Sequence, residues 1–144
     1  MSTDISVTTV ASYQAEKRSW LLSAHGTDPG TTPSINLDVS AFTAATHYPN
    51  GYLLSGIVLG KITATGKYGP YVDAAVDGTG TAAGFLFSSV KVPNTADTTK
   101  DTNGALVVHA FVDAAKLPIA NAATGGGFID ANGRTDLKLV HFTN

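Results

Sequence analysis

The sequence is poor in cysteine, in charge and in long apolar runs. It contains no cysteine, which excludes disulfide bonds, iron–sulfur clusters, thiolate zinc sites and thiol nucleophiles. Charged residues make up 14% of the chain, against about 25% in an average globular protein. Basic residues are also scattered, with Lys17–Arg18 as the only adjacent pair and a formal net charge of -2. We therefore expect no nucleic-acid partner, because phosphate binding requires clustered Lys and Arg.

No stretch of the sequence has the length or composition of a membrane span. Such a span needs roughly 18 consecutive apolar residues, and no window approaches that. The first twenty residues carry Asp4, Glu16 and several Ser and Thr where a signal peptide would have a basic start and an apolar stretch. We expect a soluble protein that stays in the compartment where it is made and has no membrane partner.

The apolar residues that are present predict a β-rich domain. Hydrophobic residues make up 43% of the 144 residues, which is enough for one core of ordinary domain size. From Ser34 onward, short apolar runs alternate with turn signals rich in Gly, Asn, Asp and Pro. The expected strands are 35–39, 57–64, 71–76, 84–92, 105–113 and 137–142, with a brief helical turn over 113–117 and turns at Asn103-Gly104 and Asn132-Gly133. The expected fold class is mainly β, or α+β with minor helix: a compact β-rich domain with an extended N-terminal arm.

The first 33 residues differ from the rest, so we divide the chain into an arm and linker (1–33) and a β-rich domain (34–144). Within the arm, 10–24 has the composition of a marginal amphipathic helix, and 26–33 is interpreted as a linker. The arm carries its own apolar residues, which cannot easily find room in a core of about 110 residues. These residues are Ile5, Val7, Tyr13, Trp20 and Leu21.

We expect the apolar residues of the arm to be buried against a neighbouring chain. Strand addition to an exposed sheet edge and docking in a groove are both open. A third possibility is that the arm pairs with its own domain as an extra edge strand.

Motifs that would indicate catalysis or cofactor binding are weak. The glycine run 78–84 is followed by the strand-like 85–87, whereas a phosphate cradle needs a helix there. Several of the Asp residues lie beside turn glycines, where they shape the turn; a glycosidase pair drawn from the Asp residues stays open. The four histidines are scattered without metal-ligand spacing: His25, His47, His109 and His141. We expect no enzyme, no catalytic residue, no metal and no cofactor.

An ordered series of turns and hairpins in the middle of the chain resembles a known family. The series is His47-Tyr48-Pro49-Asn50-Gly51-Tyr52, Ser55-Gly56-Ile57, Leu59-Gly60-Lys61-Ile62, Ala64-Thr65-Gly66-Lys67-Tyr68-Gly69-Pro70-Tyr71, Asp77-Gly78 and Ala83-Gly84-Phe85-Leu86. It is similar to the head decoration (capsid cement) proteins of tailed phages, of the lambda type. The front element Glu16-Lys17-Arg18-Ser19-Trp20-Leu21 resembles the arm region of decoration proteins in actinobacterial phages. Together these segments cover roughly residues 16–92.

The resemblance implies a structural protein of the virion. Such a protein would bind as a homotrimer to the outer surface of the expanded head, at local threefold positions, and stabilise the head against DNA pressure. It would be assembled in the host cytoplasm, and its arm would pair with the major capsid protein. In that arm, Ile5 and Val7 would add a strand, while the other three apolar residues would be buried anchors.

Two further points depend on the same resemblance. In the trimer, Tyr68, Pro70 and Tyr71 are interpreted as a turn at a subunit or capsid contact. The alternative function is a virion-surface module that binds the host or a carbohydrate through exposed Tyr and Asp residues on the Gly-rich loops.

Overall fold

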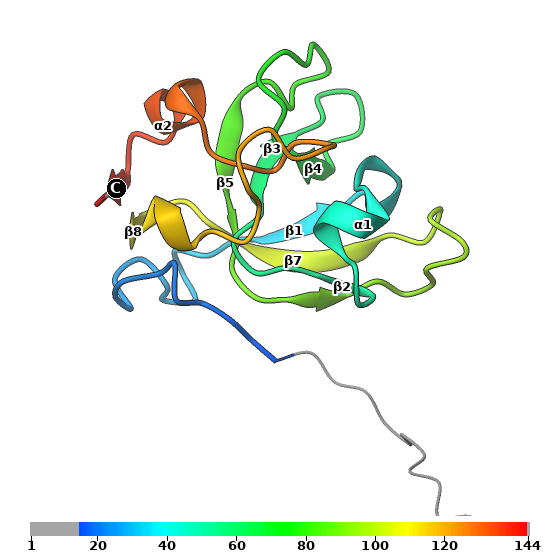
Figure 1. Cartoon of the computed structure of the whole chain (residues 1–144), viewed down its shortest axis with the longest axis horizontal. Coiled ribbons are helices and arrows are strands. Elements are labelled where there is room, and N and C mark those ends of the chain that lie inside the picture. Colours follow the sequence, from blue (N-terminus) through cyan, green and yellow to red (C-terminus); the bar gives the residue numbers. More distant parts are fainter. Residues whose placement is uncertain (1–14, 144) are drawn as a thin grey trace, which may run out of the picture.

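The computed structural model describes residues 15–143, and its centre is a small closed barrel (Figure 1). The barrel strands are β1 (Ser34–Leu37), β3 (Val58–Lys61), β4 (Tyr68–Pro70), β5 (Ala82–Leu86) and β7 (Thr102–Val107). Their order around the barrel is β1-β4-β3-β5-β7. β1 is parallel to β4 and antiparallel to β7, and the other pairs are antiparallel. Closure leaves the central sheet without a free edge for another strand to pair with.

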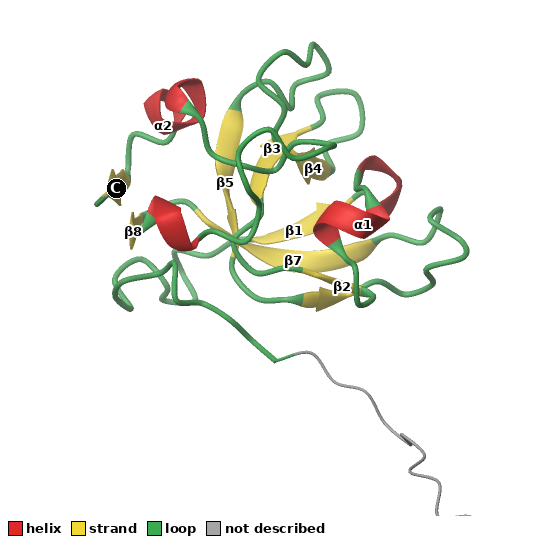
Figure 2. Ribbon diagram, in the orientation of Figure 1, coloured by secondary structure: helices red, strands yellow, loops and turns green. Residues whose placement is uncertain are grey.

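Two small sheets and four short helical turns surround the barrel (Figure 2). β2 (Tyr52–Leu53) pairs antiparallel with β6 (Val90–Lys91), and β8 (Ala110–Val112) pairs in parallel with β9 (Val140–Phe142). The helical elements are η1 (Val39–Ala41), α1 (Ala44–His47), η2 (Ala114–Lys116) and α2 (Ala131–Asp136). The mainly β fold class with minor helix is confirmed.

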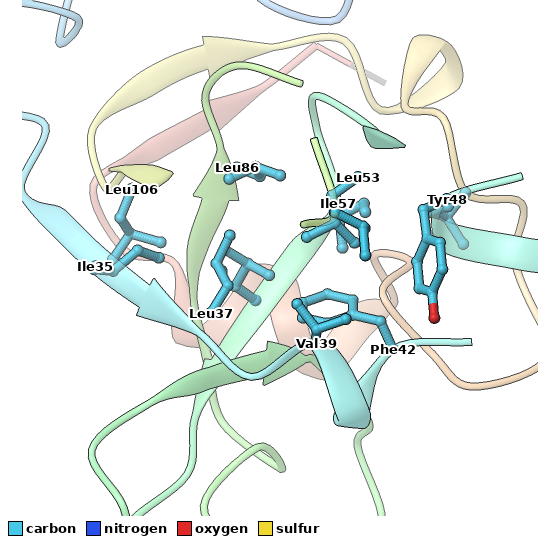
Figure 3. Packing of buried hydrophobic residues seen from close by; sticks show 12 residues of the cluster. Ile35, Leu37, Val39, Phe42, Tyr48, Leu53, Ile57, Leu86 and Leu106 are labelled. Atoms are coloured by element: carbon cyan, nitrogen blue, oxygen red, sulfur yellow. The ribbon is translucent and has the colours of Figure 1, made fainter. Parts of the chain in front are cut away.

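Two hydrophobic cores lie on opposite faces of the barrel strands, because successive side chains of a strand point to opposite sides. Leu59, Leu86 and Leu106 belong to the first core, whereas their chain neighbours Val58, Phe85 and Val107 belong to the second. Figure 3 shows the first core, in which side chains of β1, β5 and β7 meet Val39 of η1 and the nearby Phe42 and Tyr48. The second core joins the opposite face of β3, β5 and β7 to β8 and α2; its remaining members include Trp20, Tyr71, Val112, Ile129 and Leu137.

The predicted strands over 35–39 and 57–64 are confirmed in their centres, as is the helical turn within 113–117. The predicted strand over 105–113 is interrupted at 108–109, between the end of β7 and β8. The predicted strand over 137–142 is confirmed over its second half, where β9 forms. The predicted strand over 84–92 is interrupted between β5 and β6, where the Phe87 carbonyl accepts a hydrogen bond from the Ser55 hydroxyl at 2.7 Å.

Four of the local predictions are wrong. The predicted strand 71–76 is a turn region, and the chain pairs just before it, in β4. The predicted turn at Asn103-Gly104 lies inside β7, paired with β1. The predicted turn at Asn132-Gly133 lies inside α2, since the Asp130 side chain accepts from the Gly133 amide and caps that helix. In the described part of 10–24 there is no helix.

Candidate functional site

The described part of the front segment is anchored to its own domain through Trp20. The Trp20 side chain is 1% exposed and its ring centre lies 5.3 Å from that of Phe85. Its indole Nε1 donates to Ser55 Oγ at 3.2 Å, so its polar atom is satisfied inside the protein. The expectation that Trp20 is kept for another chain is therefore wrong. The physical reason is the second core: the outward face of β5 is apolar, and Trp20 covers it.

The residues after Trp20 run beside β8 as a short antiparallel pairing. Leu21 forms an isolated bridge with Val112 and packs against the second core. The Leu22 amide donates to the Phe111 carbonyl at 3.0 Å, and the Asp113 amide donates to the Trp20 carbonyl at 2.9 Å. Leu21 is thus half-buried in its own subunit, which corrects the expectation that it docks on a neighbour. For this part of the arm, the structure shows pairing with the chain's own domain.

Polar contacts hold the chain just before Trp20. The Glu16 carboxylate accepts from the Ser89 amide at 3.1 and 3.2 Å, and Arg18 Nε lies 3.4 Å from Glu16 Oε1. The Arg18 guanidinium also lies over the Phe87 ring, 4.5 Å from its centre. We call residues 16–26 the anchored stretch, because contacts to the connection between β5 and β6 and to β8 fix its course. In Figure 1 this blue stretch and β8 lie at the same end of the molecule.

Three of the predicted arm residues, Ile5, Val7 and Tyr13, lie outside the described residues. They precede the anchored stretch in the sequence. Their predicted role in binding another chain stays a prediction.

The predicted contact turn is largely buried in its own subunit. The Tyr71 side chain is 1% exposed, and its hydroxyl lies 2.9 Å from Asp130 Oδ1 and 3.2 Å from Asp73 Oδ1. Burial, followed by hydrogen bonding to these carboxylates and their negative charge, raises the pKa of Tyr71 above its usual range. Pro70 is also buried, and Tyr68 is half-buried against the first core. Pro70 and Tyr71 therefore do not form a contact turn; Tyr71 joins the end of β4 to the start of α2.

His47 is the one buried histidine among the described residues. It accepts at Nδ1 from the Thr43 amide at 2.8 Å and donates from Nε2 to the Gly126 carbonyl at 2.9 Å. Desolvation lowers the pKa of His47, although the hydrogen bond from Nε2 to the Gly126 carbonyl acts in the opposite direction. His47 is therefore neutral at pH 7. It links the glycine-rich loop at 125–127 to α1, and the sequence did not indicate this structural role.

The fold also brings together two histidines that are 84 residues apart. His25 Nε2 lies 3.0 Å from His109 Nε2. The sequence interpretation treated the histidines as scattered, because motif spacing detects only ligands on one helix or one hairpin. No local signal could have found a pair that depends on how the anchored stretch crosses β8.

The surface hollow beside α1 offers little for catalysis. Its lining is Ala44, Ala45, Tyr48, Pro49, Asn50, Gly51 and Thr95. No acid, histidine or lysine faces it, so this hollow has no pair for acid–base work. Within residues 15–143, no group of three or more potential metal-ligating side chains comes together. A search of the same residues finds no helix that is both long and apolar enough to cross a membrane.

Residues 15–143 thus form a β-rich domain to which the front segment is anchored. The sequence model of a family described as bacteriophage lambda head decoration protein D matches residues 32–138. The chain belongs to this family, and so it is a structural protein of the phage virion that decorates the capsid. No curated protein and no solved structure matches the chain. The match extends beyond the region of the initial resemblance to Lys138 and leaves out the arm before Thr32.

Proposed function

We propose that the protein binds as a homotrimer to the outer surface of the expanded phage head, at local threefold positions, and stabilises the head against DNA pressure. Its partner there is the major capsid protein, and its assembly takes place in the host cytoplasm. The similarity of 16–21 to arms of actinobacterial phage proteins supports a place in that branch of the family. Membership of the head decoration family supports binding to the capsid.

The observation that carries the proposal is the anchoring of Trp20. Because this side chain is buried and the stretch around it is bonded to β8 and to Ser89, residues before Glu16 start from a fixed place on the domain. Those residues include Ile5 and Val7, which alternate with polar neighbours as in a strand, and Tyr13. The capsid-binding arm is therefore shorter than the sequence suggested, and its apolar contacts are Ile5, Val7 and Tyr13.

Three such arms on one trimer would act together. Once one arm is bound, the other two are held close to their sites, so avidity exceeds the affinity of a single arm by a factor on the order of 10²–10⁴. A trimer bound across a junction of capsomers adds contacts that must break before the capsomers separate. The function is mechanical, and the low charge of the chain suits a surface that meets protein.

The test mixes purified protein with undecorated, expanded capsids and measures binding by co-sedimentation. Ile5→Asp with Val7→Asp places charges on the apolar positions of the predicted strand, whereas Ser6→Asp with Thr8→Asp adds the same charge on the polar positions between and beside them. We expect the first pair to abolish binding and the second to retain most of it. Equal binding by both variants would contradict the strand-addition proposal.

Two further measurements test the remaining parts. Reconstruction of decorated heads by electron microscopy should show three copies around each local threefold position; single copies elsewhere would rule out the trimer. A glycan array should show no binding, and specific glycan binding without capsid binding would favour the host-binding alternative.

A further inference from the structure

The contact between His25 and His109 has the geometry of a metal site. His25 is exposed on the anchored stretch and His109 is half-buried in the bend before β8. Their Nε2 atoms lie 3.0 Å apart, their ring centres 4.6 Å apart, and their ring planes 79° apart. The two distances can be compared with those expected for a straight hydrogen bond and for two rings that bind one ion.

A straight hydrogen bond between the rings fits these quantities poorly. With nitrogens 3.0 Å apart, ring centres in line with them would be about 5.3 Å apart, because each centre lies about 1.15 Å behind its nitrogen. The observed 4.6 Å is shorter, so at least one ring axis is inclined away from the line joining the two nitrogens.

One ion held by both nitrogens accounts for the arrangement. Nitrogens about 2.0–2.1 Å from a common ion lie about 2.9 Å apart at a right angle and about 3.4 Å apart at a tetrahedral angle. The observed 3.0 Å falls in this span. The same construction places the ring centres about 4.7 Å apart, close to the observed 4.6 Å.

The backbone, and not the histidine side chains, sets this arrangement. Gly26 follows His25 with φ +84°, and a Cβ at Gly26 would lie 1.7 Å from the His109 carbonyl oxygen. The two segments, around Gly26 and around His109, therefore touch at backbone level. The hydrogen bond from the Leu22 amide to the Phe111 carbonyl holds them together nearby. A site that is already assembled by the fold does not need the metal to order its ligands.

We propose that His25 and His109 form a two-histidine site for a divalent transition-metal ion, such as Zn²⁺, Ni²⁺ or Cu²⁺. The ion ties the anchored stretch to the bend before β8. No third histidine or carboxylate completes a cluster within the described residues, so water fills the remaining positions. Imidazole nitrogen selects these ions over Mg²⁺ and Ca²⁺, which prefer oxygen ligands.

The first test uses the full chain without a polyhistidine tag, stripped of metal. Substoichiometric Cu²⁺ is added while the histidine ring signals are followed by NMR. We expect the signals of His25 and His109 to broaden at the lowest Cu²⁺ concentration. The signal of His141, whose ring also neighbours Phe111, should broaden only as more Cu²⁺ is added, and that of His47 should persist. Broadening of His141 alone, or of no histidine, would overturn the proposal.

The second test compares matched variants by calorimetric titration with Ni²⁺ and Zn²⁺. His25→Gln and His109→Gln should each weaken binding by about tenfold or more, because the second ligand then no longer acts at high effective concentration. His141→Gln is the control: it removes an exposed histidine that neighbours Phe111 and should bind like the wild type. Mg²⁺ should give no binding. Unchanged affinity in both His25→Gln and His109→Gln would overturn the site.

Discussion

At the scale of single residues, the position of Trp20 matters most for the function. An exposed tryptophan in the arm would have been a candidate anchor on another chain, since Trp is enriched where binding energy concentrates. Instead its ring is in the second core and its Nε1 bonds to Ser55. In the proposed function, Trp20 therefore affects capsid binding indirectly, because it fixes the residues that follow the arm.

We predict that Trp20→Ala lowers the free energy of unfolding by about 3–5 kcal/mol, because it removes a fully buried aromatic side chain and leaves a cavity. Trp20→Phe keeps an aromatic ring and loses the indole N–H, so its cost should be smaller, about 1–2 kcal/mol. Urea denaturation measures both. If Trp20→Ala kept its stability but lost capsid binding, Trp20 would instead be a direct contact with the capsid.

His47 makes the stability of the protein depend on pH. Its pKa in the folded state is below the ordinary 6.5, so the unfolded chain takes up a proton at a pH where the native state does not. The contribution of His47 is therefore fully present above pH 6.5 and is lost as the pH falls below that value. The slope due to this one group is at most about 1.4 kcal/mol per pH unit.

The measurement is denaturation of the wild type and of His47→Gln at several pH values between 5 and 7.5. His47→Gln should be less stable at pH 7.5, and its stability should fall less steeply on acidification. Identical slopes in the wild type and in His47→Gln would refute the assignment.

At the scale of elements, the anchored stretch is held by its fit against β8. Gly26 lies against the His109 carbonyl with a positive φ, which residues with a side chain rarely adopt. Gly30 follows four residues later, and a Cβ there would meet nothing within 4 Å. Substitution of Gly30 is therefore a control for substitution of Gly26: both reduce chain flexibility, but only a Cβ at Gly26 would meet another part of the backbone.

We predict that Gly26→Ala detaches the anchored stretch, because the new Cβ and the His109 carbonyl cannot occupy the same space. Hydrogen exchange of the Leu22 and Asp113 amides should become faster, since their bonds to the Phe111 and Trp20 carbonyls would be disturbed. Gly30→Ala should leave both amides protected. Equal protection in the two variants would show that the contact at Gly26 does not hold the stretch.

The same scale shows what the sequence could predict. The mainly β class, the centres of β1 and β3 and the second half of β7 follow from short apolar runs between turn residues. The turn predicted at Asn103-Gly104 was wrong. This dipeptide is common in turns, but here it lies within a barrel strand, where pairing with β1 outweighs the local preference. The local sequence pattern also could not show that the outward face of β5 is apolar and is covered by Trp20.

The candidate site was predicted less well, for a related reason. The burial of Trp20 and Tyr71 and the meeting of His25 with His109 depend on contacts between residues far apart in the chain. Apolar character alone gives no indication of whether a side chain is buried in its own subunit or in a partner. Ile5, Val7 and Tyr13 lie outside the described residues, so their role in binding another chain stays a prediction.

At the scale of the whole molecule, the domain with its anchored stretch and the arm before it have different roles. The barrel and its two cores form the domain, and the anchored stretch belongs to it through Trp20 and the pairing with β8. The arm before Glu16 supplies the capsid contact that we propose. The division is different from a boundary at residue 33, because a cut there would also remove part of the second core.

The most direct test compares two truncations for folding and for binding to expanded, undecorated capsids. Deletion of residues 1–14 should leave the free energy of unfolding unchanged within about 0.5 kcal/mol and abolish capsid binding. Deletion of residues 1–30 should lower that free energy by about 3 kcal/mol or more, because it also removes Trp20 from the second core. Full capsid binding by the protein lacking residues 1–14 would contradict the account.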